Sequence, residues 1–220
     1  MIDALLGLIA PHYCISCTKL GTVLCDNCKQ NITSEPLQTC IVCRRPLVNN
    51  KCNYCTTAYI YFDAYFKRDG IIKQTIDQYK FHGIRPLASV LARLLDTHLP
   101  YFPGKTIYVS VPTARSHVRE RGFDHLDTVC REFARRRKIN YIHLIDRKNN
   151  AHQIGAKKKQ RIAQTKDLYV CRQQLDESTT YVVIDDVVTT GATLEACAHA
   201  LYMAGARKIA VVAIAYQPSN

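Results

Sequence analysis

The sequence lacks the long apolar runs that cross membranes. No stretch of its 220 residues reaches the roughly 18 consecutive apolar residues that a membrane-spanning helix requires. Residues 1–10 are apolar, but they include Asp3 and lack the basic residues with which a secretory signal begins. We therefore expect a cytoplasmic protein without a membrane span, in which residues 1–10 form a short amphipathic helix.

Residues 11–57 have too few aliphatic side chains for a hydrophobic core, so this segment needs another way to hold its fold. It contains most of the 11 cysteines of the chain, in four Cys-x-x-Cys pairs: Cys14/Cys17, Cys25/Cys28, Cys40/Cys43 and Cys52/Cys55. Cysteines of a cytoplasmic protein are thiols or metal ligands rather than disulfides. A thioredoxin-like redox motif fits poorly, because it needs a single pair within a β-α-β pattern that is lacking here.

The four pairs indicate structural zinc. Each pair offers two thiolates to one tetrahedral ion, and two pairs complete a Cys₄ site. The simplest pairing is sequential, with the first two pairs forming one site and the last two pairs another; a cross-braced arrangement fits the same spacing. We predict a small zinc-binding domain over residues 1–57 and a second domain over residues 58–220.

Acidic residues are in short supply. The chain has 18 Asp and Glu against 30 Lys and Arg, a formal net charge of +12, and residues 105–172 alone hold 17 basic and 6 acidic side chains. A basic track with aromatic residues nearby suits single-stranded nucleic acid, which needs cations for its phosphates and rings for its bases. The alternative is that these charges form solvated helix faces.

Residues 181–194 contain the most informative stretch of the sequence. The β-prone residues Tyr181–Ile184 predict a buried strand, and Asp185 and Asp186 follow it directly. A loop of Thr, Gly and Ala then leads into a helical pattern that places Leu194, Cys197, Ala198 and Leu201 on one face.

The loop from Thr189 to Thr193 has the features of a phosphate-binding site. Its backbone N–H groups and threonine hydroxyls can point at an anion, and the helix dipole favours negative charge there. Gly191 allows the backbone to approach a ligand, because it has no Cβ. Two side-by-side carboxylates would repel a phosphate but accept hydrogen bonds from ribose hydroxyls, so the motif predicts a ribose 5-phosphate ligand. The alternative is an ordinary strand–turn–helix junction whose acids cap the helix.

Alternating strand and helix patterns after residue 58 predict an α/β fold with a doubly wound sheet. Strands are expected at residues 59–66, 106–111, 141–145, 181–184 and 209–215. Helices are expected after Gly70, from Pro86, after the capping residue Asp124, and between the phosphate loop and Gly205. The arginine-rich residues 112–123 are expected to form a ligand-contacting loop, and the polar residues 147–167 a flap or a disordered segment.

The stretch around Asp185-Asp186 and Thr189-Thr190-Gly191-Ala192-Thr193 resembles the phosphoribosyl pyrophosphate (PRPP) signature of type I phosphoribosyltransferases. The whole chain is similar to the ComF family, in which a zinc-binding N-terminal segment is fused to such a domain. The similarity includes the Cys-x-x-Cys series, Lys80, Val111-Pro112, and Arg119-Glu120-Arg121-Gly122-Phe123. Where the family usually continues with Asn-Gln, this chain has Asp124-His125, and the later Arg-x-x-Asn pattern ends in Gln164.

The resemblance implies a type I phosphoribosyltransferase-like fold that binds PRPP together with Mg²⁺. It assigns a catalytic and ribose-binding role to Asp185 and Asp186. The PRPP-binding residues that it implies are Asp185, Asp186, Val188, Thr189, Thr190, Gly191, Ala192, Thr193, Lys80, Arg115 and Arg121.

The family is associated with natural competence, the uptake and handling of transforming DNA. We therefore expect a PRPP-binding protein that handles single-stranded DNA, with a competence helicase-type protein as a partner implied by the resemblance. The expected nucleic-acid contacts are Arg131, Arg135, Arg136, Lys157, Lys158 and Lys159. The alternative is an active phosphoribosyltransferase that moves ribose 5-phosphate from PRPP to a nitrogenous acceptor.

Overall fold

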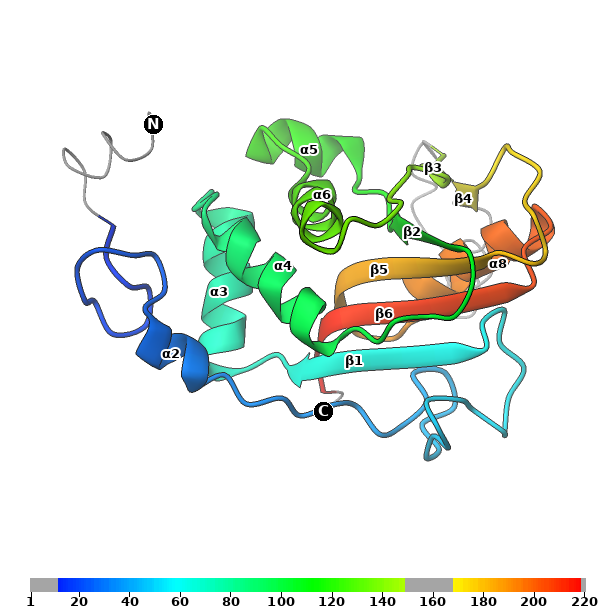
Figure 1. The fold of residues 1–220 in the computed structure, drawn as a ribbon, viewed down its shortest axis with the longest axis horizontal. Helices are drawn as coiled ribbons and strands as arrows, with labels where there is room; N and C mark the ends of the chain where they lie inside the picture. Colours follow the sequence, from blue (N-terminus) through cyan, green and yellow to red (C-terminus); the bar gives the residue numbers. More distant parts are fainter. Residues whose placement is uncertain (1–11, 149–167, 219–220) are drawn as a thin grey trace, which may run out of the picture.

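A computed structural model describes residues 12–148 and 168–218. Their centre is a four-stranded sheet in the order β1-β6-β5-β2, in which all neighbouring strands are parallel. The strands are β1 (Tyr61–Lys67), β2 (Thr106–Ser110), β5 (Thr180–Val188) and β6 (Lys208–Tyr216). Because the strands are parallel, their carboxyl ends lie at one edge, at the left of Figure 1.

Helices cover both faces of this sheet. Figure 1 shows α4 (Leu87–His98) and α6 (His125–Arg137) in front of the strands and α8 (Ala192–Met203) behind them, with α3 (Gly70–Phe81) beside α4. Covered faces explain why β5 and β6 are almost continuously apolar and buried. The expected doubly wound α/β architecture is confirmed.

The helices follow the apolar spacing of the sequence. In α3, Ile72, Ile76 and Tyr79 are buried, and in α4 the buried Leu87, Leu91 and Leu95 recur every four residues. Helix α6 begins after Asp124, whose Oδ1 accepts a hydrogen bond from the Asp127 backbone N–H at 3.1 Å, as predicted for a cap.

The outer edge of β1 is covered by the chain that joins the two groups of cysteines. After the short helix α2 (Asp26–Gln30), the backbone N–H groups of Glu35 and Leu37 donate to the carbonyls of Tyr65 and Ala64, at 3.1 and 2.9 Å. These bonds satisfy backbone groups that an open strand edge would leave unpaired. The division of the chain at residues 57 and 58 stays a prediction.

Two expected elements are different in the structure. Residues 115–121 of the expected arginine-rich loop form helix α5 (Arg115–Arg121), which ends at Gly122 with a φ of 75°. The expected strand at residues 141–145 is reduced to a single parallel bridge between Tyr141 and Tyr108. Beyond it, the side chain of His143 contacts α6, with its Nε2 2.8 Å from Asp127.

The chain then forms a small hairpin of β3 (Asp146–Arg147) and β4 (Tyr169–Val170). Among the described residues, none of the helices is long and apolar enough to cross a membrane. The residues predicted as an N-terminal helix lie outside the described residues. The same holds for the predicted polar flap, of which only Arg147 and Lys148 are described.

Candidate functional site

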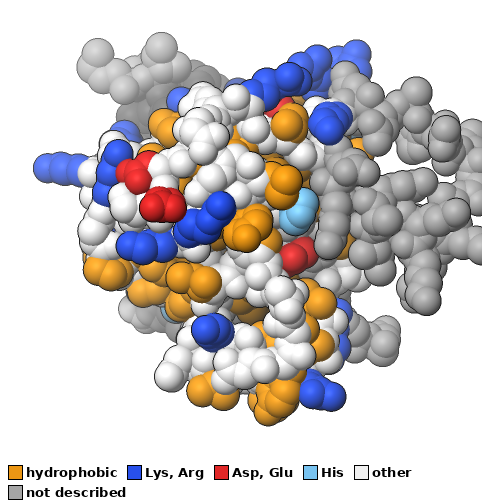
Figure 2. All heavy atoms as spheres, turned by 90° about the vertical axis from the view of Figure 1, so that its right-hand side faces the viewer, with side chains coloured by type: hydrophobic (Ala, Val, Ile, Leu, Met, Phe, Trp, Pro, Cys, Tyr) orange, Lys and Arg blue, Asp and Glu red, His pale blue; other side chains and the backbone are white. Residues whose placement is uncertain are grey.

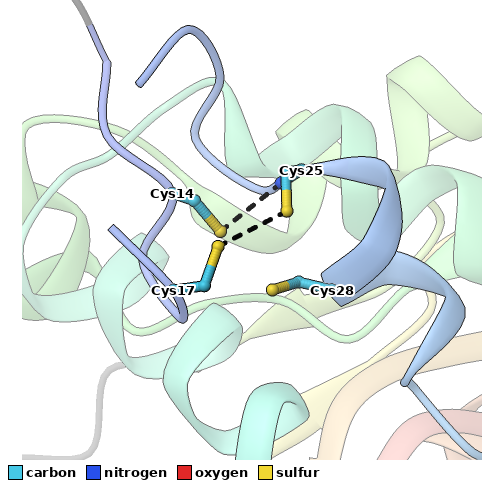
Figure 3. A group of neighbouring side chains, drawn as sticks. All are labelled: Cys14, Cys17, Cys25 and Cys28. Atoms are coloured by element: carbon cyan, nitrogen blue, oxygen red, sulfur yellow. Dashed lines mark hydrogen bonds between the residues drawn. The ribbon is translucent and has the colours of Figure 1, made fainter. Parts of the chain in front are cut away.

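The eight paired cysteines form two groups of four. Cys14, Cys17, Cys25 and Cys28 make one cluster, shown in Figure 3 with the sulfur atoms directed at one another, and Cys40, Cys43, Cys52 and Cys55 make the other. In each cluster all the sulfur atoms lie within 4.8 Å of one another. The sequential pairing predicted from the spacing is therefore the one that the structure has.

The sulfur distances suit a tetrahedral metal ion. Four sulfurs at the usual zinc–thiolate distance of about 2.3 Å lie about 3.8 Å from one another. The observed separations include 3.6 Å between Cys17 and Cys25 and 3.5 Å between Cys43 and Cys52. Both clusters are compatible with a structural Zn²⁺.

Backbone N–H groups also prepare the sulfurs for a cation. The N–H of Cys25 donates to Cys14 Sγ at 3.5 Å, and that of Tyr54 donates to Cys52 Sγ at 3.4 Å. The Tyr54 bond lowers the pKa of the Cys52 thiol to about 6, whereas burial raises the pKa of Cys40 in the same cluster. Such hydrogen bonds stabilise the thiolate form, which is the form that binds metal.

The predicted phosphate loop lies between β5 and α8. Thr189 and Thr190 are exposed, and Gly191 adopts a φ of 76° immediately before the first turn of the helix. The structure gives Gly191 a further reason. A Cβ on Gly191 would lie 2.4 Å from Cδ1 of Ile41, so the missing side chain makes room for the second cysteine cluster. Close approach of the backbone to a ligand stays a prediction.

Asp185 and Asp186 lie within the strand and not, as was expected, after it. The strand was predicted to end at Ile184, but β5 continues to Val188, and both acids are part of it. Successive residues of a strand point to opposite faces. Asp186 therefore faces α3 and α6, whereas the charge of Asp185 acts on Cys197 of α8 and on Tyr169.

Asp186 is the centre of a buried network of charged and polar groups. Its Oδ2 lies 2.5 Å from Lys80 Nζ and 2.7 Å from His125 Nε2. The other ring nitrogen of His125, Nδ1, lies 3.0 Å from Arg121 Nη1, and the Tyr79 hydroxyl donates to the His125 carbonyl at 2.8 Å. Although burial alone would raise the pKa of Asp186, Lys80 and His125 hold it well below its usual range.

Asp185 has the opposite electrostatic environment. Burial, followed by the neighbouring charge of Asp186, raises its pKa to about 7. Asp185 Oδ1 accepts the backbone N–H of Asp186 at 2.8 Å. The two adjacent acids thus differ in environment: Lys80 and His125 hold Asp186 in its charged form, whereas burial and the charge of Asp186 raise the pKa of Asp185.

A cavity of about 570 Å³ adjoins this network between the end of α3 and α5. Lys80 and Arg121 line it, together with Phe81, His117, Glu120 and Phe123. Of the cations predicted to meet PRPP, Lys80 and Arg121 come together through Asp186 and His125. Arg115 lies exposed at the start of α5.

The arginines predicted to contact nucleic acid line the exposed side of α6, where each is paired. Arg131 Nε lies 2.7 Å from Asp127, and Arg135 and Arg136 lie 2.8 and 3.0 Å from Glu132. Arg131 and Arg135 keep most of their side chains exposed, and ion pairs of exposed side chains contribute little stability. Lys157, Lys158 and Lys159 lie outside the described residues.

Three residues of the site were missed in the sequence. His125 was visible only as a departure from the family pattern, directly after the predicted helix cap Asp124. Ile41 and Arg44, from the second cysteine cluster, lie against the phosphate loop. No local pattern indicates a contact between residues separated by about 150 positions in the chain.

The cysteine clusters predict the metal content. Purified protein should hold about two zinc ions per chain by elemental analysis, and a strong chelator should abolish the fold of residues 12–57. Structural zinc provides about 10–16 kcal/mol of apparent binding energy, far more than so small a segment gains by burial. Protein isolated without chelators that contains no zinc would contradict this expectation. A content near one zinc ion per chain would mean that one of the two clusters does not bind zinc.

The buried network predicts a stability difference between two aspartates. Asp186→Asn should lower the free energy of unfolding by about 3–5 kcal/mol in a denaturant titration, because it leaves Lys80 buried without its anion. Since the pKa of Asp186 is depressed, this contribution is fully present above the unfolded pKa, about 4, and is lost as pH falls through the folded value.

The control is Asp69→Asn, which breaks the exposed ion pair with Lys67 and should cost less than about 1 kcal/mol. Equal losses for the two variants at pH 7 would mean that the Asp186 network does not hold these elements together.

Comparison with known proteins adds a consistent but distant likeness. No family model matches the chain. Competence protein ComFC of Bacillus subtilis (strain 168) is 25% identical over 203 residues, which are 83% of this chain and 79% of that protein. Competence protein ComFC of Streptococcus pneumoniae (strain ATCC BAA-255 / R6) is 21% identical over 191 residues, 84% of each.

Two solved structures are similar to part of the fold. A glutamine PRPP amidotransferase from B. subtilis, complexed with ADP and GMP, covers 57% of this chain and 25% of its own, at 16% identity and a TM-score of 0.40. A hypoxanthine phosphoribosyltransferase from Trypanosoma cruzi covers 60% and 66%, at 13% identity and a TM-score of 0.32. With two Cys₄ clusters placed beside a doubly wound parallel sheet, the chain resembles the ComFC competence proteins along more than four fifths of its length.

Proposed function

We propose that the protein binds PRPP, or a closely related ribose 5-phosphate ligand, at the carboxyl edge of the sheet. The observation that carries this proposal is the network in which Asp186 and His125 bring Lys80 and Arg121 together beside the phosphate loop. A loop at a helix N-terminus takes one phosphate, and two cations held nearby suit a second anionic group. PRPP has both groups, joined by a ribose.

Asp185 is the proposed acceptor for the ribose hydroxyls. Asp186 already receives Lys80 and His125 and is nearly buried, whereas Asp185 is half-buried at the entrance to the phosphate loop. Asp186 then acts indirectly, by positioning Lys80 and the His125 ring. Mg²⁺ bound to the pyrophosphate of the ligand would neutralise part of its charge, which is the chemistry that this ion supplies to phosphoryl groups.

The proposed role is the handling of single-stranded DNA, in keeping with the competence function named for both relatives. The cavity beside Lys80 supports this role, because it combines rings with cations. Phe81 is 64% exposed, Arg121 lies over its ring at 5.4 Å, and Arg85 lies over Phe123 at 5.1 Å. Sequence-independent binding of single strands uses stacking surfaces of this kind beside positive charge.

The opposite side of the molecule offers a poorer surface for DNA. Figure 2 views the protein from the amino ends of the strands, where the described Lys and Arg side chains are scattered among hydrophobic and acidic ones. The α6 arginines Arg131, Arg135 and Arg136 remain the proposed phosphate contacts, together with Lys157, Lys158 and Lys159. The proposed path of single-stranded DNA therefore follows α6 and the cavity, where these arginines and the exposed ring of Phe81 lie.

An active phosphoribosyltransferase is the second candidate, and the same cavity favours it. A free nucleobase stacked on Phe81 or Phe123 would lie next to the residues proposed to hold PRPP. The two functions differ in a measurable product, since only transfer to a base releases pyrophosphate. Incubation with PRPP, Mg²⁺ and a panel of free bases, followed by a pyrophosphate assay, separates them.

The electrostatics of Asp185 predict how PRPP binding depends on pH. Affinity measured by calorimetry should rise between pH 6 and pH 8, as Asp185 loses its proton near pH 7 and becomes a stronger acceptor. Asp185→Asn should weaken binding about tenfold at pH 8, because charge-assisted hydrogen bonds are roughly twice as strong as neutral ones.

PRPP itself changes protonation with pH, in the same way for wild type and Asp185→Asn. The difference between their two curves of affinity against pH therefore reports on Asp185. Parallel curves would exclude Asp185 as the ribose acceptor. If wild-type protein binds no PRPP at either pH, the proposed function is wrong.

The aromatic cavity predicts a selective loss of DNA binding. Phe81→Ala should weaken binding of a fluorescent single-stranded oligonucleotide by about 5- to 150-fold, because one stacked base contributes about 1–3 kcal/mol. Tyr101→Ala is the control: Tyr101 is 74% exposed and does not line the cavity. Equal affinities of wild type and Phe81→Ala at the same salt concentration would show that bases do not stack there.

A further inference from the structure

The second cysteine cluster is in direct contact with the phosphate loop. We call residues 40–44, which form its first turn, the second knuckle. Ile41, at its tip, is 1% exposed and covers the Cα of Gly191, which is itself buried. The loop can approach this closely only because residue 191 has no Cβ. The packing of Ile41 therefore supports the left-handed backbone with which Gly191 begins α8.

Arg44 makes a second contact from the same knuckle. Its Nη2 donates to the Thr189 carbonyl at 3.4 Å. The backbone of the knuckle holds Arg44 in place, since its N–H donates to the Cys40 carbonyl at 2.9 Å with a φ of 64°. Of the five N–H donors of a guanidinium, this contact uses one, which leaves the positive charge available to an anion in the loop.

The chain after the second cluster contacts the first turn of α8. The backbone N–H of Ala58 donates to Glu195 Oε1 at 3.2 Å, while the Glu195 N–H donates to the Gly191 carbonyl at 2.9 Å. Contacts thus reach the loop at Thr189, at Gly191 and one turn into the helix. The three contacts are therefore distributed along the backbone whose N–H groups are predicted to hold a phosphate.

The first cluster has a different position. Among the described residues, the hydrogen bonds of its segment connect only residues 12–32 with one another. In Figure 1 this segment and α2 lie beside α3, away from α8. Two clusters of the same composition therefore occupy unequal positions with respect to the phosphate loop.

We propose that the second knuckle is part of the ligand site: Ile41 holds the phosphate loop in its binding conformation, and Arg44 supplies a cation to the phosphate bound there. The role of Arg44 rests on the proposed function, whereas the positioning by Ile41 does not. Metal in the second cluster and ligand in the loop then stabilise the same arrangement, so each raises the affinity for the other. The first cluster has no such effect.

The role of Ile41 can be tested without any ligand, by hydrogen exchange of the peptide covering residues 188–196. Ile41→Ala should speed exchange in this peptide, because the loop loses its cover. Val42→Ala, a change at the exposed neighbouring residue, should leave the exchange rate unchanged. Equal rates in wild type and Ile41→Ala would overturn the positioning of the loop by the knuckle.

The role of Arg44 is tested with PRPP and Mg²⁺ in calorimetry. Arg44→Gln should weaken binding about tenfold or more, the effect of one charge-assisted hydrogen bond. The matched control is Arg45→Gln, which removes the same charge from the adjacent residue; the Arg45 guanidinium lies over the Tyr54 ring at 4.9 Å. Equal PRPP affinities of the two variants would overturn the proposal for Arg44. Wild-type protein that does not bind PRPP would instead contradict the proposed function.

The coupling is tested by comparing the two clusters. Cys40→Ser with Cys43→Ser and, separately, Cys14→Ser with Cys17→Ser should each lose one zinc ion by elemental analysis. The first pair of changes should weaken PRPP binding and speed exchange of residues 188–196, and the second should do neither. Identical effects of the two pairs on both readouts would mean that the clusters contribute only to the overall fold.

Discussion

The buried carboxylate of Asp186 is the constraint on which the site depends. It accepts Lys80 from the end of α3 and His125 from the start of α6, and it is itself part of β5. An anion in this position is stable only with such partners, because desolvation of an unpaired charge costs several kcal/mol. The need to satisfy one carboxylate therefore ties three elements together at the carboxyl edge of the sheet.

The same network determines which groups remain available for a ligand. Arg121 reaches it through the His125 ring, at the edge of a cavity that also contains two phenylalanines. Asp185, one residue earlier, faces the other side of the sheet and keeps a raised pKa. A single pair of adjacent acids thus supplies one fixed structural anion and one group that changes charge near neutral pH.

The cysteine-rich segment is connected to the rest of the protein in two ways. Between its clusters the backbone pairs with β1 and covers the edge of the sheet, and at the second cluster Ile41 and Arg44 contact the phosphate loop. A segment too poor in aliphatic residues to have its own core thus contributes to the sheet and to the candidate site. The metal-compatible turns give it the rigidity that these contacts require.

The sequence predicted most of what depends on local patterns. The helix after Asp124 has its expected cap, the apolar face of α8 is buried where the spacing placed it, and the cysteine pairs group as their order suggests. These features were predictable because capping, helical periodicity and Cys-x-x-Cys turns are determined by residues a few positions apart.

Only the tertiary structure decided the geometry of the site. The length of β5 depends on its pairing with β6, and that pairing extends the strand to Val188 and sends Asp185 and Asp186 to opposite faces. The strand expected at residues 141–145 is a single bridge from Tyr141 to Tyr108, and both Tyr141 and His143 contact Asp127 of α6. The reason for Gly191 lies about 150 residues away, at Ile41. The sequence alone determined most of the elements and the grouping of the cysteine pairs. Long-range packing decided which residues of the candidate site meet, because contacts between distant residues leave no periodic signal in the chain.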